Sequence, residues 1–65
     1  MLISICVQGY DNNWTIDNSF TRNEFSFINE AEAVAYCNDY NSRNYKEFQD
    51  GNSYYRNGYY AWIAV

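Results

Sequence analysis

The residues whose chemistry stands out in this sequence are aromatic, and they concentrate in its last third. Seven of them lie between positions 45 and 62: Tyr45, Phe48, Tyr54, Tyr55, Tyr59, Tyr60 and Trp62. Tyr, Trp and Arg are the residue types that most often anchor protein interfaces, because they bury a large area at a low cost in side-chain entropy. Arg56 lies among these tyrosines. The segment therefore predicts a binding surface.

The order of residues from Tyr54 to Tyr60 also predicts how the rings are arranged. Asn57-Gly58 stands between aromatic strand formers, and Asn-Gly is the preferred type I′ turn of a β-hairpin. Adjacent strand residues point to opposite faces, so these tyrosines cannot all enter one core. The predicted partner-binding residues are Tyr54, Tyr55, Arg56, Tyr59, Tyr60 and Trp62. In the competing interpretation, cross-strand tyrosine pairs only stabilise an exposed hairpin.

A second candidate contact surface is acidic and consists of Glu32, Asp39 and Asp50. Such a surface would face a basic partner, for example the nucleic-acid channel of an enzyme. The simpler interpretation is a solvated helix face. The net charge of −4 is scattered along the chain, and the four basic residues form no stripe. Binding to duplex nucleic acid through counterion release is therefore not expected.

Catalysis is not expected, because the usual reactive groups are missing. The sequence has no histidine, which removes the commonest general base and any Ser/His or Cys/His arrangement within the chain. It has neither of the glycine-rich motifs that hold phosphates, and no pair of its carboxylates has motif-like spacing. Two cysteines without histidine cannot supply a four-ligand zinc site, so neither a metal nor another cofactor is expected.

The two cysteines, Cys6 and Cys37, stand in apolar contexts and are expected to be reduced thiols in the core. A disulfide between them stays open as an alternative. The apolar start of the chain is too short for a signal peptide, and no apolar run is long enough to cross a membrane. The expected location is therefore the cytoplasm.

Strand patterns flank the centre of the chain. Residues 2–8 alternate between apolar and polar types, residues 9–13 have turn chemistry, and residues 14–17 alternate again, so residues 2–17 are predicted to form a β-hairpin. The segment from Asn18 to Glu24 is polar around Phe20 and predicts a loop or an irregular strand, which Phe25 and Phe27 could continue with inward-pointing rings.

The central segment predicts an amphipathic helix over about residues 30–43. Asn29 can cap its start, and Glu32 stands at the capping-box spacing. Ile28 and Ala33 could form a hydrophobic staple. At 100° per residue the apolar side comprises Ala33, Val34, Cys37 and Tyr40, with Tyr36 at its edge, and the polar side comprises Glu32, Asp39, Ser42 and Arg43.

After the helix, residues 45–48 predict a short strand that ends at the turn residues 49–52, and residues 59–65 alternate once more. The predicted fold is α+β: one domain over residues 1–65, with an antiparallel sheet of about four or five strands in the order ββ(β)αββ and one helix packed on one face.

Three functions of different classes fit this profile. The leading hypothesis is a non-enzymatic accessory protein of a phage or mobile element, which inhibits a host defence protein by occupying its surface, as anti-CRISPRs do. An alternative is a ligand- or nucleotide-sequestering or single-strand nucleic-acid-binding module, whose tyrosines and Arg56 stack on bases. A third is a structural subunit that uses its tyrosines for self-assembly. The expected partner is thus a host protein or a second copy, in the host cytoplasm if a phage encodes the chain.

Overall fold

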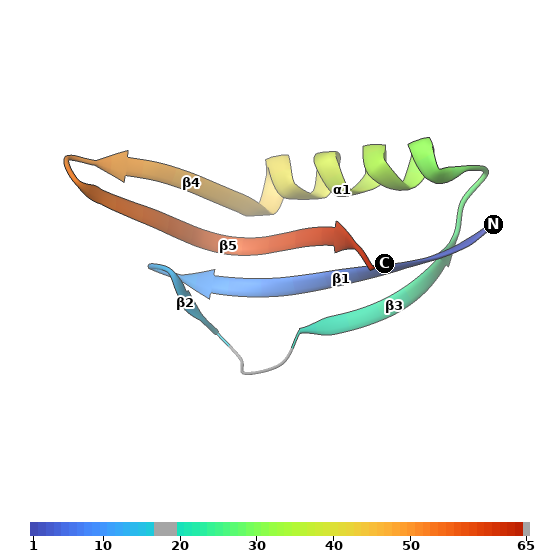
Figure 1. Ribbon diagram of the computed structural model, residues 1–65, viewed down its shortest axis with the longest axis horizontal. Coiled ribbons are helices and arrows are strands. Elements are labelled where there is room, and N and C mark those ends of the chain that lie inside the picture. Colours follow the sequence, from blue (N-terminus) through green and yellow to red (C-terminus); the bar gives the residue numbers. More distant parts are fainter. Residues whose placement is uncertain (17–19, 65) are drawn as a thin grey trace.

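The computed structural model describes residues 1–16 and 20–64. This part of the chain contains one helix and five strands, and every strand pairing is antiparallel (Figure 1). The elements are β1 (Leu2–Asp11), β2 (Trp14–Thr15), β3 (Thr21–Ser26), α1 (Glu30–Asn44), β4 (Tyr45–Asp50) and β5 (Ser53–Ile63). The α+β class and the ββ(β)αββ order are confirmed. Asp17 and residues 18, 19 and 65, which the sequence-based assignments included, lie outside the described residues.

The strands are arranged around β1 and β5, which pair along six residues from Ile5↔Ile63 to Tyr10↔Gly58. Beyond β5 lies β4, and the opposite edge of β1 is shared by β2 and β3. The long strands β1 and β5 therefore form the centre of the sheet. One of its edges is formed by β2 and β3 and the other by β4.

The first hairpin lies within the predicted residues 2–17, but its turn is shorter than predicted, because β1 extends through residues 9–11. Asn12 and Asn13 have φ values of 51° and 76°, and the strands on either side pair as Asp11↔Trp14. Positive φ at both central residues is the requirement of a type I′ turn, and asparagine tolerates it well. The backbone N–H of Asn12 also donates to Oδ1 of Asn57 at 2.6 Å, which ties this turn to β5.

The predicted turn at residues 49–52 is confirmed, because the chain reverses at Gly51-Asn52, between the paired residues Asp50 and Ser53. The predicted hairpin turn at Asn57-Gly58 is wrong, because β5 runs through these residues without a break. Gly58 is paired on both sides, with Tyr10 and with Tyr45. At its φ of 97°, a Cβ atom would lie 1.9 Å from the carbonyl oxygen of Asn44. Glycine is needed here because the end of α1 approaches the strand, a contact that local sequence does not reveal.

The start of α1 agrees with the sequence in its cap but not in its staple. The N–H of Glu32 donates to Oδ1 of Asn29 at 3.0 Å, and the Glu32 carboxylate accepts from the N–H of Ile28 at 2.9 Å. The predicted staple between Ile28 and Ala33 is absent, because Ala33 is turned into the core while Ile28 is 85% exposed.

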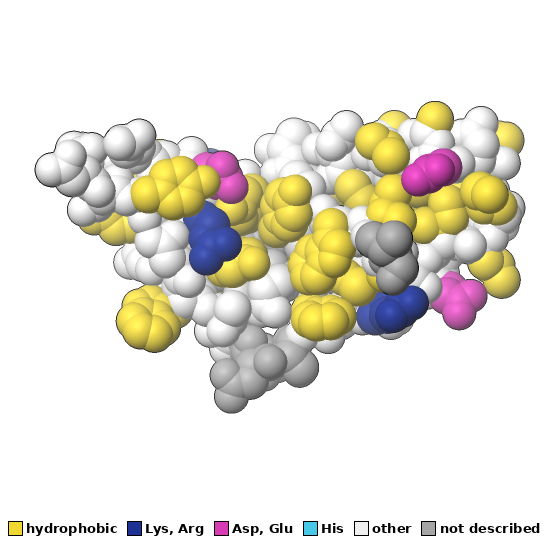
Figure 2. Space-filling view, viewed as in Figure 1, with side chains coloured by type: hydrophobic (Ala, Val, Ile, Leu, Met, Phe, Trp, Pro, Cys, Tyr) yellow, Lys and Arg dark blue, Asp and Glu magenta, His cyan; other side chains and the backbone are white. Residues whose placement is uncertain are grey.

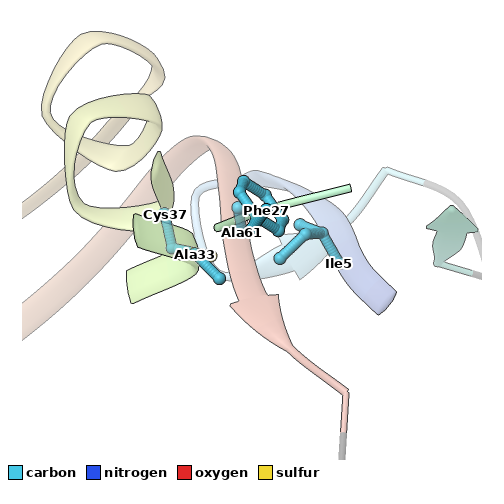
Figure 3. Close-up of a cluster of buried hydrophobic side chains, with 5 residues drawn as sticks. All are labelled: Ile5, Phe27, Ala33, Cys37 and Ala61. Carbon is cyan, nitrogen blue, oxygen red and sulfur yellow. The ribbon is translucent and has the colours of Figure 1, made fainter. Parts of the chain in front are cut away.

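The core lies between α1 and the two central strands. Its buried side chains are Ile5, Phe27, Ala33, Cys37 and Ala61 (Figure 3). Ile3, Val7, Tyr40 and Ile63 pack around them. The small side chains of Ala33 and Ala61 let the helix approach the sheet closely. Val34, expected on the buried side of α1, is exposed instead because the helix is covered along only the stripe of Ala33, Cys37 and Tyr40.

Both cysteines are buried, and both thiols are free. Cys37 belongs to the core beneath α1, whereas Cys6 follows Ile5 on the strand and so points to the other face of the sheet. The disulfide alternative is therefore not realised. Burial raises the pKa of the Cys37 thiol, which keeps it protonated and unreactive at neutral pH.

One side chain of α1 completes the edge of β5 at Ala61, beyond the point where β4 begins its pairing with β5. The N–H of Ala61 donates to Oδ1 of Asn41 at 2.6 Å, and Nδ2 of Asn41 donates to the carbonyl of Ala61 at 3.0 Å. The amide thus supplies the donor and acceptor that a neighbouring strand would supply. In the ribbon view α1 lies along this part of β5, in line with β4 (Figure 1).

Within the described part of the chain, the helix is too short and too polar to cross a membrane.

Candidate functional site

The sheet has one face beneath α1 and one face that carries no helix, here called the outer face. Ile5 and Ala61 point toward α1. Their strand neighbours Cys6, Tyr60 and Trp62 must therefore point to the outer face, because successive side chains alternate. Figure 2 shows hydrophobic side chains gathered over the middle of the molecule, with basic side chains at separate places along it.

A row of five rings crosses the outer face, and we call it the aromatic row: Phe20, Trp62, Tyr60, Tyr45 and Tyr10. The ring centroids of Phe20 and Trp62 are 5.4 Å apart, those of Trp62 and Tyr60 6.4 Å, and those of Tyr60 and Tyr45 4.9 Å. Tyr45 and Tyr10 follow at 6.1 Å. Edge-to-face and offset contacts of this kind fix each ring against its neighbours, so the row is a preorganised surface.

Gly58 lies at the Tyr10 end of this row. Tyr10 and Tyr45 are its partners on the two neighbouring strands, so all three residues face the same side of the sheet. The rings of Tyr10 and Tyr45 meet across it, with their centroids 6.1 Å apart. The residue that sequence analysis placed in a turn therefore lies between two strands and admits the end of α1.

The end of the row near Tyr10 carries polar groups. The Arg56 guanidinium carbon lies 4.3 Å from the centroid of the Tyr10 ring, a cation–π contact. The Tyr45 hydroxyl donates to Oε1 of Glu47 at 2.6 Å. Hydrogen bonds from Tyr45 and Tyr54 hold the pKa of the Glu47 carboxyl below its usual range. Burial and the bond to Glu47 raise the pKa of Tyr45, and the same carboxylate raises the pKa of Tyr54.

Beneath the aromatic row the sheet is filled rather than hollow. Cys6 and Gln8 lie on the same face and are buried, and Nε2 of Gln8 donates to the carbonyl of Gly9 at 3.1 Å. A cleft of about 360 Å³ lies elsewhere, lined by Met1, Leu2, Ile3, Ser4, Glu30, Ile63 and Ala64. The outer face is thus a broad surface, suited to contact with another surface rather than to enclosing a small substrate.

The structure divides the predicted binding residues between two faces. Tyr54, Arg56, Tyr60 and Trp62 belong to the outer face, as their alternation along β5 and their contacts require. Tyr55 and Tyr59 point to the other face, where Tyr55 stacks on Phe48 with centroids 5.1 Å apart. Tyr59 lies over Gly9, close enough that a Cβ atom there would come within 2.9 Å of its ring. The predicted set is therefore not one site.

Sequence reasoning missed Tyr10, Phe20 and Tyr45 as members of the surface. Tyr10 was assigned to a turn, although it shares the period-two position of Cys6 and Gln8 on the outer face. That spacing was the available signal. Phe20 gave no local signal, because its place beside Trp62 depends on how β3 pairs with β1.

The acidic candidates are not brought together. Glu32 is engaged in the cap of α1, and Asp39 forms an exposed ion pair with Arg43 at 3.4 Å. Asp50 ends β4, at the far end of the second hairpin from the helix (Figure 1). Exposed pairs of this kind contribute little stability. The three residues are separate features of the surface rather than one contact site.

The charges of the outer face cancel. Arg22 and Glu24 pair with Cys6 and Ser4 and so share their face, and Glu47 pairs with Arg56 at the other end. These two positive and two negative groups sum to zero, so the net charge of −4 comes from the rest of the chain. Across residues 1–16 and 20–64, no cluster of three or more His, Cys, Asp or Glu side chains could hold a metal ion.

Comparisons of this chain with protein-family models, with curated proteins and with solved structures gave no match.

Proposed function

We propose that this chain is a non-enzymatic binding protein that applies its outer face to the surface of a partner protein. The observation that carries the proposal is the aromatic row, which is ordered by ring contacts yet left uncovered by α1. Phe20 and Tyr60 remain 53% and 38% exposed. A surface of this kind loses little entropy on binding, because its rings are already held in place.

The size of the face supports a protein partner. The molecule measures 42 × 23 Å across the two longer axes, in the plane that Figure 2 displays. A standard protein interface buries about 800 Å² on each partner, so most of one face would be used. Aromatic rings at the centre, with Arg56 and Glu47 at one end, match the apolar centre and polar rim of such interfaces.

The narrower form of the proposal is a phage-encoded inhibitor of a host defence protein. What supports it is the profile of the sequence: 65 residues, an acidic balance and no histidine. Steric occupation of a surface needs no reactive group, and the outer face offers a way to achieve it.

A nucleic-acid-binding or nucleotide-sequestering function is the second candidate, because open tyrosine and tryptophan rings can stack on bases. The charges of the outer face argue against it. Strand binding normally combines stacking with a positive groove, whereas Arg22 and Arg56 are balanced here by Glu24 and Glu47.

Two neighbouring tyrosines provide a matched test. Tyr59 and Tyr60 are 48% and 38% exposed and point to opposite faces, so Tyr60→Ala and Tyr59→Ala remove the same side chain from different surfaces. Each variant would be immobilised and exposed to a lysate of the encoding organism and of its host. We expect wild type and Tyr59→Ala to retain the same protein, and Tyr60→Ala to lose it.

Capture that is equal in both variants would contradict the assignment of the outer face, and capture lost only with Tyr59→Ala would move the site to the helix side. If neither variant nor wild type retained a protein, but single-stranded oligonucleotides raised the melting temperature of wild type and not of Tyr60→Ala, the stacking function would replace the proposed one.

A further inference from the structure

We infer that the free edge of β3 pairs with β3 of a second copy, so that two chains form one continuous sheet with a twofold axis at Asn23. This inference does not depend on the proposed function, because it uses an edge of the sheet rather than its outer face. It is based on two observations: the main-chain groups that β3 leaves unused, and the order of charges along it.

The unused groups follow from the alternation of bonds in an antiparallel ladder. The carbonyl of Met1 accepts from the N–H of Phe27 at 2.8 Å, while the carbonyl of Ser4 accepts from Ala64 at 2.9 Å. Odd-numbered residues of β1 therefore bond toward β3 and even-numbered ones toward β5. Ile5 is one of the odd-numbered residues, so its partner Asn23 bonds toward β1. Arg22 and Glu24 alternate with Asn23 along β3, and their N–H and C=O groups therefore point away from the sheet.

Among the strands that the structure describes, β3 pairs with β1 alone, and all six of its residues are exposed. It contains no proline, and α1 packs chiefly on β5, β4 and β1, although its Tyr36 ring contacts Phe25 on the helix side of β3. Such an edge is a template for another strand, and proteins usually block it with a proline, a bulge or a covering element. The edge of β5, by comparison, is closed by Asn41.

The charges of β3 identify the second copy as the strand that fits. Arg22 and Glu24 lie two residues apart on one face, with Asn23 between them. If two β3 strands run antiparallel about Asn23, each Arg22 lies directly opposite Glu24 of the other copy. Opposite charges in directly opposed positions stabilise a strand pair, and like charges destabilise it. The same two pairs exchange four main-chain hydrogen bonds.

This register also covers an apolar side chain. On the helix side of the strand, Phe25 would lie opposite Thr21 of the other copy. Phe25 is 39% exposed and contacts the rings of Phe27 and Tyr36 at 6.3 and 5.7 Å, so the added strand would extend an existing aromatic cluster.

The edge of β4 is a poorer place for a second copy. Asn44 ends α1 and Tyr45 begins β4, so the helix stands directly at the start of this strand. A strand added to β4 would meet the last turn of α1. The N–H of Tyr45 is also already bonded to the carbonyl of Asn41.

The test uses charge reversal, with association measured by sedimentation equilibrium over a range of concentrations. Wild type is expected to dimerise. Arg22→Glu and Glu24→Arg each place like charges opposite one another twice in the dimer, and each is expected to weaken association about tenfold or more. An equimolar mixture of the two variants is expected to restore dimers as mixed pairs. Lys46→Glu makes the same change of charge on β4 and is expected to dimerise as wild type does.

A second readout is amide hydrogen exchange of wild type, in which protection of the Arg22 and Glu24 amides should rise with protein concentration. The inference is overturned if wild type remains monomeric at every concentration, if either single reversal associates as tightly as wild type, or if the mixture stays monomeric. Loss of dimers in Lys46→Glu or Tyr60→Ala, with Arg22→Glu unaffected, would move the interface to β4 or to the outer face.

Discussion

At the scale of single residues, glycines show most clearly how this fold constrains its sequence. Gly58 and Gly51 both have positive φ, 97° and 61°, but their surroundings differ. A Cβ atom at Gly51 would meet nothing within 4 Å, whereas at Gly58 it would overlap the backbone carbonyl of Asn44. A backbone carbonyl at the end of a helix cannot move aside as a flexible side chain can. The two positions therefore separate the cost of an unfavourable φ from the cost of a steric clash.

We predict that Gly58→Ala destabilises the fold by about 3 to 4 kcal/mol, the sum of backbone strain and forced displacement of α1. Gly51→Ala is the matched control and should cost about 1 kcal/mol, because only its φ is unfavourable. Urea denaturation followed by tryptophan fluorescence gives both values. Equal costs in the two variants would show that the approach of α1 to Gly58 does not constrain the strand.

At the scale of elements, Asn41 connects α1 to β5 and also protects the edge of that strand. Its amide forms two hydrogen bonds with Ala61, at 2.6 and 3.0 Å, in a partly buried position. An alanine at this position would leave an N–H and a C=O of β5 without a partner and would open the strand edge toward other chains.

Asn41→Ala is predicted to lower the free energy of unfolding by about 2 kcal/mol, because two partly buried main-chain groups lose their partners. It should also aggregate faster on warming, as an open edge allows. Asn38→Ala, on the exposed side of the same helix, is the control and should change stability by less than about 0.5 kcal/mol. Thermal unfolding and light scattering measure the two effects. An Asn41→Ala protein as stable as the control would mean that water replaces the amide without cost.

The elements that sequence analysis predicted correctly are those set by local chemistry. The helix followed from the Asn29 cap and from its period, and the first hairpin followed from Asn12 and Asn13. Asn57-Gly58 has equally strong local turn chemistry, but pairing on both sides of Gly58 and the end of α1 override it. For the same reason the site was predicted only in part: alternation requires an outer face, but strand register decides that Tyr10 and Phe20 join it.

At the scale of the whole molecule, the fold is more elongated than a compact domain with the same number of residues. Its radius of gyration is 13.1 Å, compared with about 11 Å for a compact domain of this size. One helix covers one part of one sheet face, so the second hairpin extends beyond it (Figure 1). This hairpin carries aromatic side chains on both faces. A small core and an open sheet are consistent with a protein whose remaining apolar surface is used in association.

Titrating groups of the outer face, together with Tyr40 at the core, predict how the stability of the whole molecule depends on pH. The pKa of Glu47 is lowered in the folded state, so its contribution is complete above the ordinary carboxyl pKa of about 4.3 and is lost as the pH falls through the folded value. The pKa values of Tyr40, Tyr45 and Tyr54 are raised, so their contributions are complete below about pH 10 and are lost as the pH rises above it.

We therefore expect the free energy of unfolding to be nearly constant between about pH 5 and 9 and to fall on either side. Glu47→Gln should reduce the loss of stability at acid pH, because the amide does not titrate. The loss at alkaline pH should keep the contribution of Tyr40, which lies away from Glu47 and owes its raised pKa to burial. Melting temperatures from pH 2 to 11 distinguish these cases, and an acid side that is unaltered in Glu47→Gln would assign the acid sensitivity to another carboxyl.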